Sequence, residues 1–320
     1  MMLATLPEFV PPQAVAANNL KGEVLAIRMV RLLGDNGIRA ILLKGPAIRL
    51  WLYDDGTPRL YADIDLLVDP ELLLAGESVL AGVGFEHPID DPWDREGPWH
   101  AREWMKPGEE VRIELHRTVP GIGVQPTEAW QVLSKQTDPF PLRGAVVDAL
   151  DLPTRAMHIA LHAAQDGGRL GKGLDDLYRA LDRVSFEQWS QALEVATRLK
   201  AVDSFAAGLR LDERGVRIAE ELSLAPPSTA ESLKMALRST GGDPALALDW
   251  VVTRSRLRDK ASALLKKVFP TPAFMRKKYP LARRGAAGLG MAYAKRLVRL
   301  VRILPMAVRA WRNGRTTSDE

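Results

Sequence analysis

Apolar and polar positions in the first part of the chain follow two different periods. From residue 13 to residue 35, apolar side chains recur close to every 3.6 residues, which predicts an amphipathic helix that ends before Gly37. Two short apolar runs follow, residues 40–44 and residues 62–68, and an amphipathic stretch and a polar turn separate them. We therefore expect a strand, a turn, a helix, a loop and a second strand across this stretch.

The pattern then changes along the chain. Residues 71–81 predict a helix, and residues 110–116 alternate between apolar and polar side chains as a strand does. The stretch between them, residues 86–108, is rich in Pro, Asp, Trp and His, and we expect a long irregular connection or a hairpin there. A turn rich in Pro and Asp at residues 138–141 precedes the Leu-Asp-Leu-Pro sequence at residues 150–153, where we place a domain boundary.

Almost every periodic segment beyond this boundary is helical. The expected helices cover residues 154–165, 174–183, 186–199, 202–207 and 214–222. The predicted fold class is therefore α/β (more strictly α+β), with a small mixed sheet in residues 1–150 and a mostly α-helical domain in residues 151–320.

Composition restricts the class of protein. The chain has 320 residues, enough for a sizeable core and for two domains. It has no cysteine, which excludes disulfides and thiolate metal sites and is typical of a cytoplasmic protein. It has no run of about 18 apolar residues, and its first residues lack the basic-then-apolar layout of a secretory signal. We therefore expect a cytoplasmic protein.

Charge is distributed unevenly. The net charge is only +4, yet basic residues greatly outnumber acidic ones from Arg254 to Arg315. Four of the basic residues share roughly one face of a predicted helix near the end of the chain: Lys295, Arg299, Arg302 and Arg309. A basic amphipathic helix can contact an anionic membrane or nucleic acid, and it can equally pack on the rest of the protein with its charges solvated. Peripheral membrane contact through residues 276–315 is therefore one open alternative.

The strongest chemical signal is a pair of aspartates in the second predicted strand. Alternate side chains of a strand share one face, so the carboxylates of Asp63 and Asp65 point the same way, about 7 Å apart at Cα. Two like charges this close repel each other unless a cation lies between them, and carboxylate oxygens suit Mg²⁺. The alternative is a solvent-facing strand end that carries two incidental acids.

Three segments of the chain resemble a known family. Leu43-Lys44-Gly45, Arg59 and the run Asp63-Ile-Asp-Leu-Leu-Val68 resemble the uncharacterised nucleotidyltransferase family of the DNA polymerase beta-like superfamily. In that superfamily a glycine turn opens a helix beneath the nucleotide phosphates, two strand aspartates bind divalent ions, and a third carboxylate stands on a later strand. The segment that ends in Glu-Leu-His116 matches that later strand, so the resemblance implies that Glu114 is the third carboxylate. Its alternative is an exposed glutamate on an edge strand.

The resemblance implies a Mg²⁺-dependent nucleotidyltransferase. Such an enzyme moves a nucleoside monophosphate from an NTP, such as ATP, to a hydroxyl acceptor, which we expect to be a small molecule or a saccharide. The expected cofactor is Mg²⁺ in a two-metal site, or Mn²⁺. The expected catalytic and metal-binding residues are Asp63, Asp65 and Glu114, and the expected nucleotide-binding residues are Lys44, Gly45 and Arg59.

One residue departs from the superfamily pattern. Pro46 follows Gly45 where a second glycine or a serine is usual, and proline has no N–H to donate to a phosphate. A catalytically inactive relative that binds a nucleotide or a partner is therefore the alternative.

Histidines form the last candidate group. His158 and His162 lie four residues apart, hence on one face of a predicted helix, and could bind zinc. The helix lacks the H-E-x-x-H pattern, so we expect the pair to pack or to form hydrogen bonds where the domains meet. The family also has a helical H-x-x-x-H followed by an Asp-Leu pair, which implies that Asp176 supports the cleft. His116 could orient a substrate, but we expect a structural role.

Overall fold

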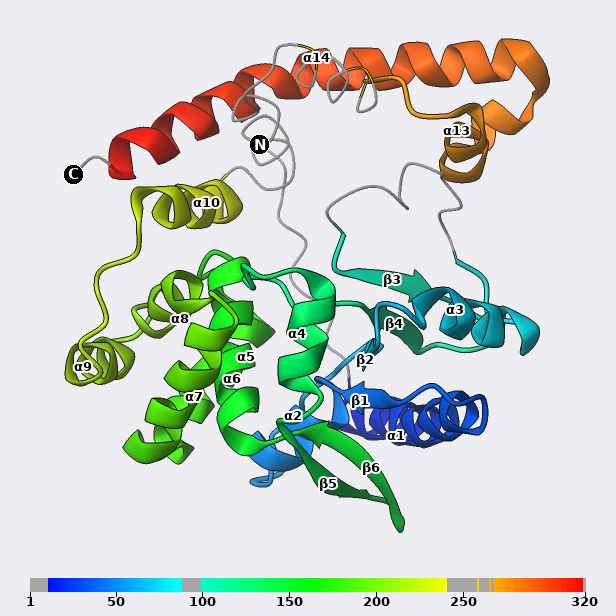
Figure 1. Cartoon of the computed structure of the whole chain (residues 1–320). Helices are drawn as coiled ribbons and strands as arrows, with labels where there is room; N and C mark the ends of the chain where they lie inside the picture. The colour runs from blue at the N-terminus through cyan, green and yellow to red at the C-terminus, as the bar shows by residue number, and fades with distance from the viewer. Residues whose placement is uncertain (1–10, 88–98, 241–257, 259–264, 266–267, 319–320) are drawn as a thin grey trace.

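The computed structural model describes residues 11–87, 99–240, 258, 265 and 268–318. Within these residues a six-stranded mixed sheet lies against a bundle of helices, and a long C-terminal helix runs along one side of the molecule (Figure 1). The mixed α/β fold class predicted from the sequence is confirmed.

The sheet joins strands that are far apart in the sequence. In spatial order it consists of β3 (Ala101–Trp104), β4 (Arg112–His116), β2 (Asp63–Val68), β1 (Ala40–Leu42), β6 (Ala145–Leu150) and β5 (Thr137–Leu142). β1 is antiparallel to β2 and parallel to β6, whereas β2 and β4 are parallel. In the β2–β4 register Asp65 lies opposite Glu114, so the two acids stand about 4.8 Å apart at the level of the strands.

The two faces of the sheet belong to different hydrophobic cores. α1 (Pro12–Asp35) and α3 (Leu73–Gly82) cover one face, and Ile64 and Leu66 of β2 point into that core. Leu67 points to the other face, which packs on the helical bundle. Because side chains alternate along a strand, Asp63 and Asp65 also face the bundle.

The bundle follows the sheet directly in the sequence. Its helices are α5 (Leu152–Gln165), α6 (Lys172–Arg183), α7 (Phe186–Arg198), α8 (Val202–Leu209) and α9 (Glu213–Glu221), while α2 (Pro46–Leu52) and α4 (Pro126–Leu133) complete the side that faces the sheet. Asp151 caps α5 by accepting a hydrogen bond from the Thr154 N–H at 2.9 Å. A capping box formed by Ser185 and Gln188 starts α7. The core of the bundle is continuous with the sheet, so the predicted boundary near residue 150 stays a prediction.

The C-terminal part has a small core of its own. It consists of α13 (Pro272–Lys278), a 3₁₀ turn (Pro280–Arg283) and α14 (Gly285–Ser318), joined around Met275, Ala282 and Ala292. α14 runs beside α10 (Thr229–Thr240), away from the sheet (Figure 1). Among the helices that the structure describes, none is both long enough and apolar enough to cross a membrane.

Two stretches that the sequence predicts as turns or connections contain strands of the sheet. The turn predicted at residues 138–141 is wrong, because these residues belong to β5, which pairs with β6 in a hairpin. Pro139 and Pro141 are tolerated there because β5 is the edge strand of the sheet, where a missing N–H costs little. Residues 86–108, predicted as an irregular connection or a hairpin, include β3, which is antiparallel to β4; residues 88–98 of this stretch lie outside the described residues.

Candidate active site

A small cavity lies between the sheet and α5. Its volume is about 230 Å³, and it is lined by Lys44, Asp63, His100, Glu114, His116, Val119, Pro120, His158, His162 and Gln165. The sheet contributes the acids, and α5 contributes a face of histidine and glutamine. The cavity therefore brings together residues that the sequence places in separate motifs.

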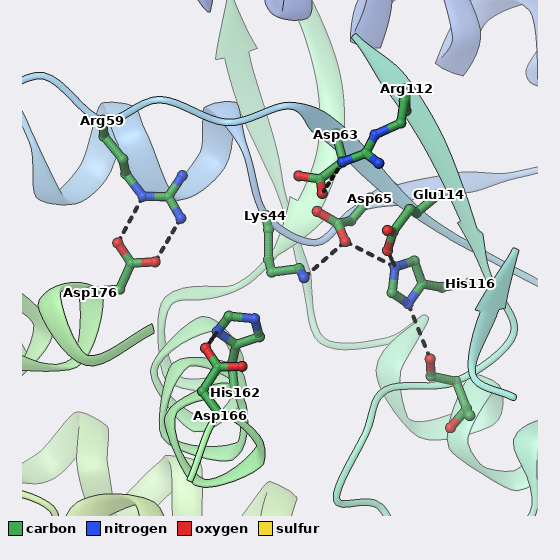
Figure 2. A network of polar contacts seen from close by, with 11 residues as sticks. Lys44, Arg59, Asp63, Asp65, Arg112, Glu114, His116, His162, Asp166 and Asp176 are labelled. Carbon is green, nitrogen blue, oxygen red and sulfur yellow. Dashed lines mark hydrogen bonds and ion pairs between the residues drawn. The ribbon is translucent and has the colours of Figure 1, made fainter. Parts of the chain in front are cut away.

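Asp65, Glu114 and His116 form a compact group, in which Glu114 and His116 line the cavity and Asp65 is buried beside them. His116 Nε2 lies 3.0 Å from Asp65 Oδ1 and 3.4 Å from Glu114 Oε2, and Figure 2 shows the ring beside both carboxylates. Each of the three residues offers one ligand atom, and these atoms all lie within 4.8 Å of one another. The register of β2 and β4 produces the group, because it puts Asp65 beside Glu114 and Leu67 beside His116.

Lys44 supplies positive charge at the same point. It lies two residues after the end of β1, and its Nζ lies 2.9 Å from the Asp65 oxygen that also contacts His116 (Figure 2). Asp65 is 1 % exposed, so burial alone would raise the pKa of its carboxyl group. The charge of Lys44 and the hydrogen bond with His116 outweigh burial and hold that pKa well below its usual range.

The pKa shifts of His116, Glu114 and Lys44 all favour the charged form of the side chain. Burial by itself would lower the pKa of His116, but its hydrogen bonds with Asp65 and Glu114 raise it, which favours the imidazolium. The same hydrogen bond with His116 lowers the pKa of Glu114. Burial would likewise lower the pKa of Lys44, and the adjacent Asp65 raises it. The two carboxylates are thus held together by the charge of Lys44 and by the hydrogen bonds of His116.

Asp63 stands beside this cluster but outside it. Its nearest cation in an ion pair is Arg112, with 3.9 Å between Asp63 Oδ2 and the guanidinium (Figure 2). Burial, followed by the charge of Asp65, raises the pKa of Asp63. The group of three close ligand atoms therefore contains His116 in the place where the sequence suggested Asp63.

α5 forms the opposite wall. His158, His162 and Gln165 follow one another at intervals of four and three residues, and all three line the cavity. Within the described residues, His158 Nδ1 and Gln165 Oε1 are buried without a hydrogen-bond partner. His162 Nδ1 lies 3.7 Å from Asp166 Oδ2, and burial lowers the pKa of both histidines, so both rings are neutral near pH 7.

His100 is a residue of the cavity that the sequence did not reveal. It precedes β3, and its ring centroid lies 5.6 Å from that of His116. Burial, with a smaller contribution from His116, lowers the pKa of His100 to about 4. No periodicity marks this residue, because it lies in the stretch that lacks a regular pattern.

Arg59 does not line this cavity. Its Nε and Nη2 donate to the two oxygens of Asp176 at 2.7 and 2.6 Å, and Tyr53 Oη donates to the same carboxylate at 2.7 Å (Figure 2 shows the Arg59–Asp176 pair). Arg179 and Arg183 of α6 also donate to the backbone carbonyls of Leu52 and Trp51. The loop between α2 and β2 is therefore held against α6, a position that agrees with a supporting role for Asp176, and nucleotide binding by Arg59 stays a prediction.

Gly45 turns the chain between β1 and α2. Its φ of 62° and ψ of −113° lie in a region that residues with a side chain avoid. A Cβ at this position would also lie 3.4 Å from the carbonyl oxygen of Asp63. Pro46 is the first residue of α2, where its missing N–H removes no helix hydrogen bond.

Comparison with known families decides the classification. Residues 12–214 match the family model described as "Uncharacterised nucleotidyltransferase". The chain belongs to this family. The match covers the sheet and the bundle as far as the start of α9, and it leaves α10, α13 and α14 outside.

The chain was also compared with curated proteins and with solved structures. No curated protein matches the chain. A solved structure, of an antigenic nucleotidyltransferase-like protein from Paracoccidioides brasiliensis, is similar to it at 16% identity over 66% of this chain and 94% of that chain. The TM-score of this likeness is 0.35.

Proposed function

We propose that the protein is a divalent-metal-dependent nucleotidyltransferase that moves a nucleoside monophosphate from an NTP to a hydroxyl acceptor. The observation that carries the proposal is the pairing of Asp65 with Glu114 on adjacent parallel strands, with Lys44 at the same oxygen of Asp65. This arrangement, in a member of a nucleotidyltransferase family, supports metal-assisted phosphoryl transfer better than a structural role.

The donor set fits a hard or borderline divalent ion. Asp65 and Glu114 offer carboxylate oxygens, as Mg²⁺ and Mn²⁺ prefer, and Asp63 of β2 offers a further carboxylate that lines the same cavity. His116 contacts both carboxylates, and its Nε2 would have to lose its proton before it could act as a ligand, a nitrogen that Mn²⁺ accepts more readily than Mg²⁺. A bound ion would supply positive charge for the phosphates and would lower the pKa of the attacking hydroxyl.

The residues around the acids supply the remaining functions. Lys44 would neutralise phosphate oxygens once its contact with Asp65 is exchanged for one with the nucleotide. Gly45 would let the backbone approach the phosphates, and we keep Arg59 as a predicted nucleotide-binding residue. The acceptor would bind against His158, His162 and Gln165, where unpartnered polar atoms suit the hydroxyl groups of a small molecule or saccharide.

The competing proposal is an inactive relative that binds a nucleotide or a partner. Pro46 favours it, because the start of α2 has one fewer N–H to offer a phosphate. Turnover in the presence of Mg²⁺ or Mn²⁺ distinguishes the two proposals, because only the transferase releases pyrophosphate.

Calorimetric binding of ATP, GTP, CTP and UTP, with and without Mg²⁺ or Mn²⁺, tests the site. We expect metal-dependent binding of at least one NTP to the wild type and its loss in Asp63→Asn/Asp65→Asn. Asp148→Asn is the matched control, since Asp148 of β6 pairs with Arg39 on the surface, two strands from β2 and outside the residues that line the cavity. Absence of nucleotide binding by the folded wild type would overturn the proposal.

A further inference from the structure

The C-terminal segment has a charge opposite to that of the rest of the chain. Residues 260–318 contain 15 Lys and Arg residues and no Asp or Glu, which leaves 29 basic and 40 acidic residues elsewhere. The small net charge of +4 therefore conceals a segment of +15 joined to a remainder of −11. Such asymmetry is an electrostatic signal for an anionic partner.

The outer side of α14 combines this charge with exposed apolar side chains. Val298 is 52% exposed, Val301 67% and Leu304 53%. Lys295, Arg299, Arg302 and Arg309 are exposed beside them. At 100° per residue the valines and the leucine occupy one arc of the helix and these four cations occupy the arc next to it. We call this combined surface the α14 face.

The inner side of the helix accounts for its attachment to the molecule. Ala292 is buried in the small core with Met275 and Ala282, and Tyr293 Oη donates to the carbonyl of Pro270. Leu300 is half-buried on this side, and Leu297, which lies between Leu304 and Val301 around the helix, is half-buried as well. Packing therefore explains one side of α14 and leaves the α14 face toward solvent.

The mixture of side chains indicates which anionic partner fits. A nucleic acid would pair with the cations, but its phosphates would gain nothing from the three exposed aliphatic side chains on the adjoining arc. The headgroup region of a lipid bilayer accepts both: aliphatic side chains enter the acyl boundary while Lys and Arg reach the anionic headgroups. The apolar and basic arcs adjoin along the helix, as they do in helices that lie in the membrane interface.

We propose that the α14 face binds the surface of an anionic lipid bilayer, with the helix lying in the plane of the interface. Val298, Val301 and Leu304 insert, and the four cations contact the headgroups. The acidic remainder of the chain is repelled by the same surface, so the sheet and its cavity face away from the bilayer or stand beside it. This binding is independent of nucleotide transfer.

Co-sedimentation of the full chain with vesicles tests the proposal. We expect binding to vesicles of 70% phosphatidylcholine and 30% phosphatidylglycerol, little binding to pure phosphatidylcholine, and a decrease as salt rises. Arg299→Gln/Arg302→Gln should weaken binding about 25-fold, since each basic residue near the surface contributes about fivefold. Val301→Ser/Leu304→Ser should weaken binding to the same vesicles and leave its salt dependence unchanged.

The matched control removes two charges elsewhere. Arg31→Gln/Lys135→Gln changes two exposed basic residues outside α14 and should bind anionic vesicles like the wild type. Equal losses in this control would show that only total charge matters, which would overturn the proposal. So would absence of vesicle binding, or binding to duplex nucleic acid that is stronger than vesicle binding and insensitive to the serine variant. A dimer in sedimentation velocity that is lost in the glutamine variant, without vesicle binding, would assign the α14 face to a second copy of the chain.

Discussion

His158 shows how burial at a single residue couples the cavity to pH. Its ring is 2% exposed, and burial, with the charge of Lys44 second, lowers its pKa well below 6.5. The folded protein thus keeps the ring neutral, while the unfolded chain takes up a proton near pH 6.5. The unfolded state binds more protons below that pH, so the contribution to stability is complete above pH 6.5 and is lost as pH falls.

His158→Gln should therefore reduce the acid sensitivity of the protein. For one proton the free energy of unfolding falls by about 1.4 kcal/mol per pH unit below 6.5, and the variant should lack this part of the decrease. Urea denaturation of both proteins at pH 7.5 and 5.5 measures it. The raised pKa of His116 has the opposite effect on the pH dependence of stability, but His116 is present in both proteins, so its contribution cancels in the comparison. Equal decreases in the two proteins would contradict the argument.

The Arg59–Asp176 ion pair is almost fully buried on both sides, and it predicts a large effect on stability. Asp176→Asn would leave the guanidinium of Arg59 buried without its counter-charge, and we expect a loss of about 3–5 kcal/mol in urea denaturation. Asp54→Asn is the control, because Asp54 pairs with Arg183 in solvent and should leave the midpoint unchanged. A loss in Asp176→Asn no larger than in the control would mean that solvent reaches Arg59.

The sequence predicted the acids of the candidate site better than their partners. The spacing of Asp63 and Asp65 gives their common face, and the resemblance to the family supplied Glu114. The partner of Arg59 could not be derived, because residue 176 is distant in sequence and only the packing of α6 on the α2–β2 loop brings it close. The position of His100 in the cavity could not be predicted for the same reason, because its place beside His116 depends on the pairing of β3 with β4.

At the scale of elements, the turn from β1 into α2 depends on Gly45. Gly45→Ala would force a side chain into a strained backbone conformation, and we expect a loss of about 1–3 kcal/mol in urea denaturation. Gly34→Ala is the matched control, because Gly34 lies inside α1 with nothing within 4 Å of a new Cβ. That variant should be as stable as the wild type or gain up to about 1 kcal/mol. Equal changes in the two variants would show that the turn relaxes.

Local periodicity predicts most helices and strands, but it does not predict β5 at the edge of the sheet. The helices of the bundle and the strand of Asp63 and Asp65 have strong periods of 3.6 and 2, and they appear close to the expected positions. β5 has no such signal, because Pro139 and Pro141 resemble a turn in isolation. Only the pairing with β6 at the edge of the sheet makes that segment a strand, and pairing is not a local property.

At the scale of the whole molecule, the sheet and the bundle share one core. Ile41, Leu43 and Leu67 of the sheet side are buried in the same cluster as Trp189 and Phe205 of the bundle. The cavity also takes its two walls from the two parts. We infer that residues 12–225 unfold as one cooperative unit, even though the sheet and the helices contribute different residues to the cavity.

Truncation tests this inference. A fragment of residues 1–150 would expose the sheet face that α5 covers, including Leu43 and Leu67, which are fully buried in the whole chain. Each such side chain contributes roughly 1.5–3 kcal/mol through burial, so exposing several exceeds the 5–15 kcal/mol by which a domain is usually stable. We expect residues 1–150 to give no cooperative transition in urea, and residues 1–225 to give a single one that coincides by fluorescence and circular dichroism. A cooperative transition in the shorter fragment would show instead that the boundary near residue 150 separates two independently stable domains, and the cavity would then lie at an interface able to open.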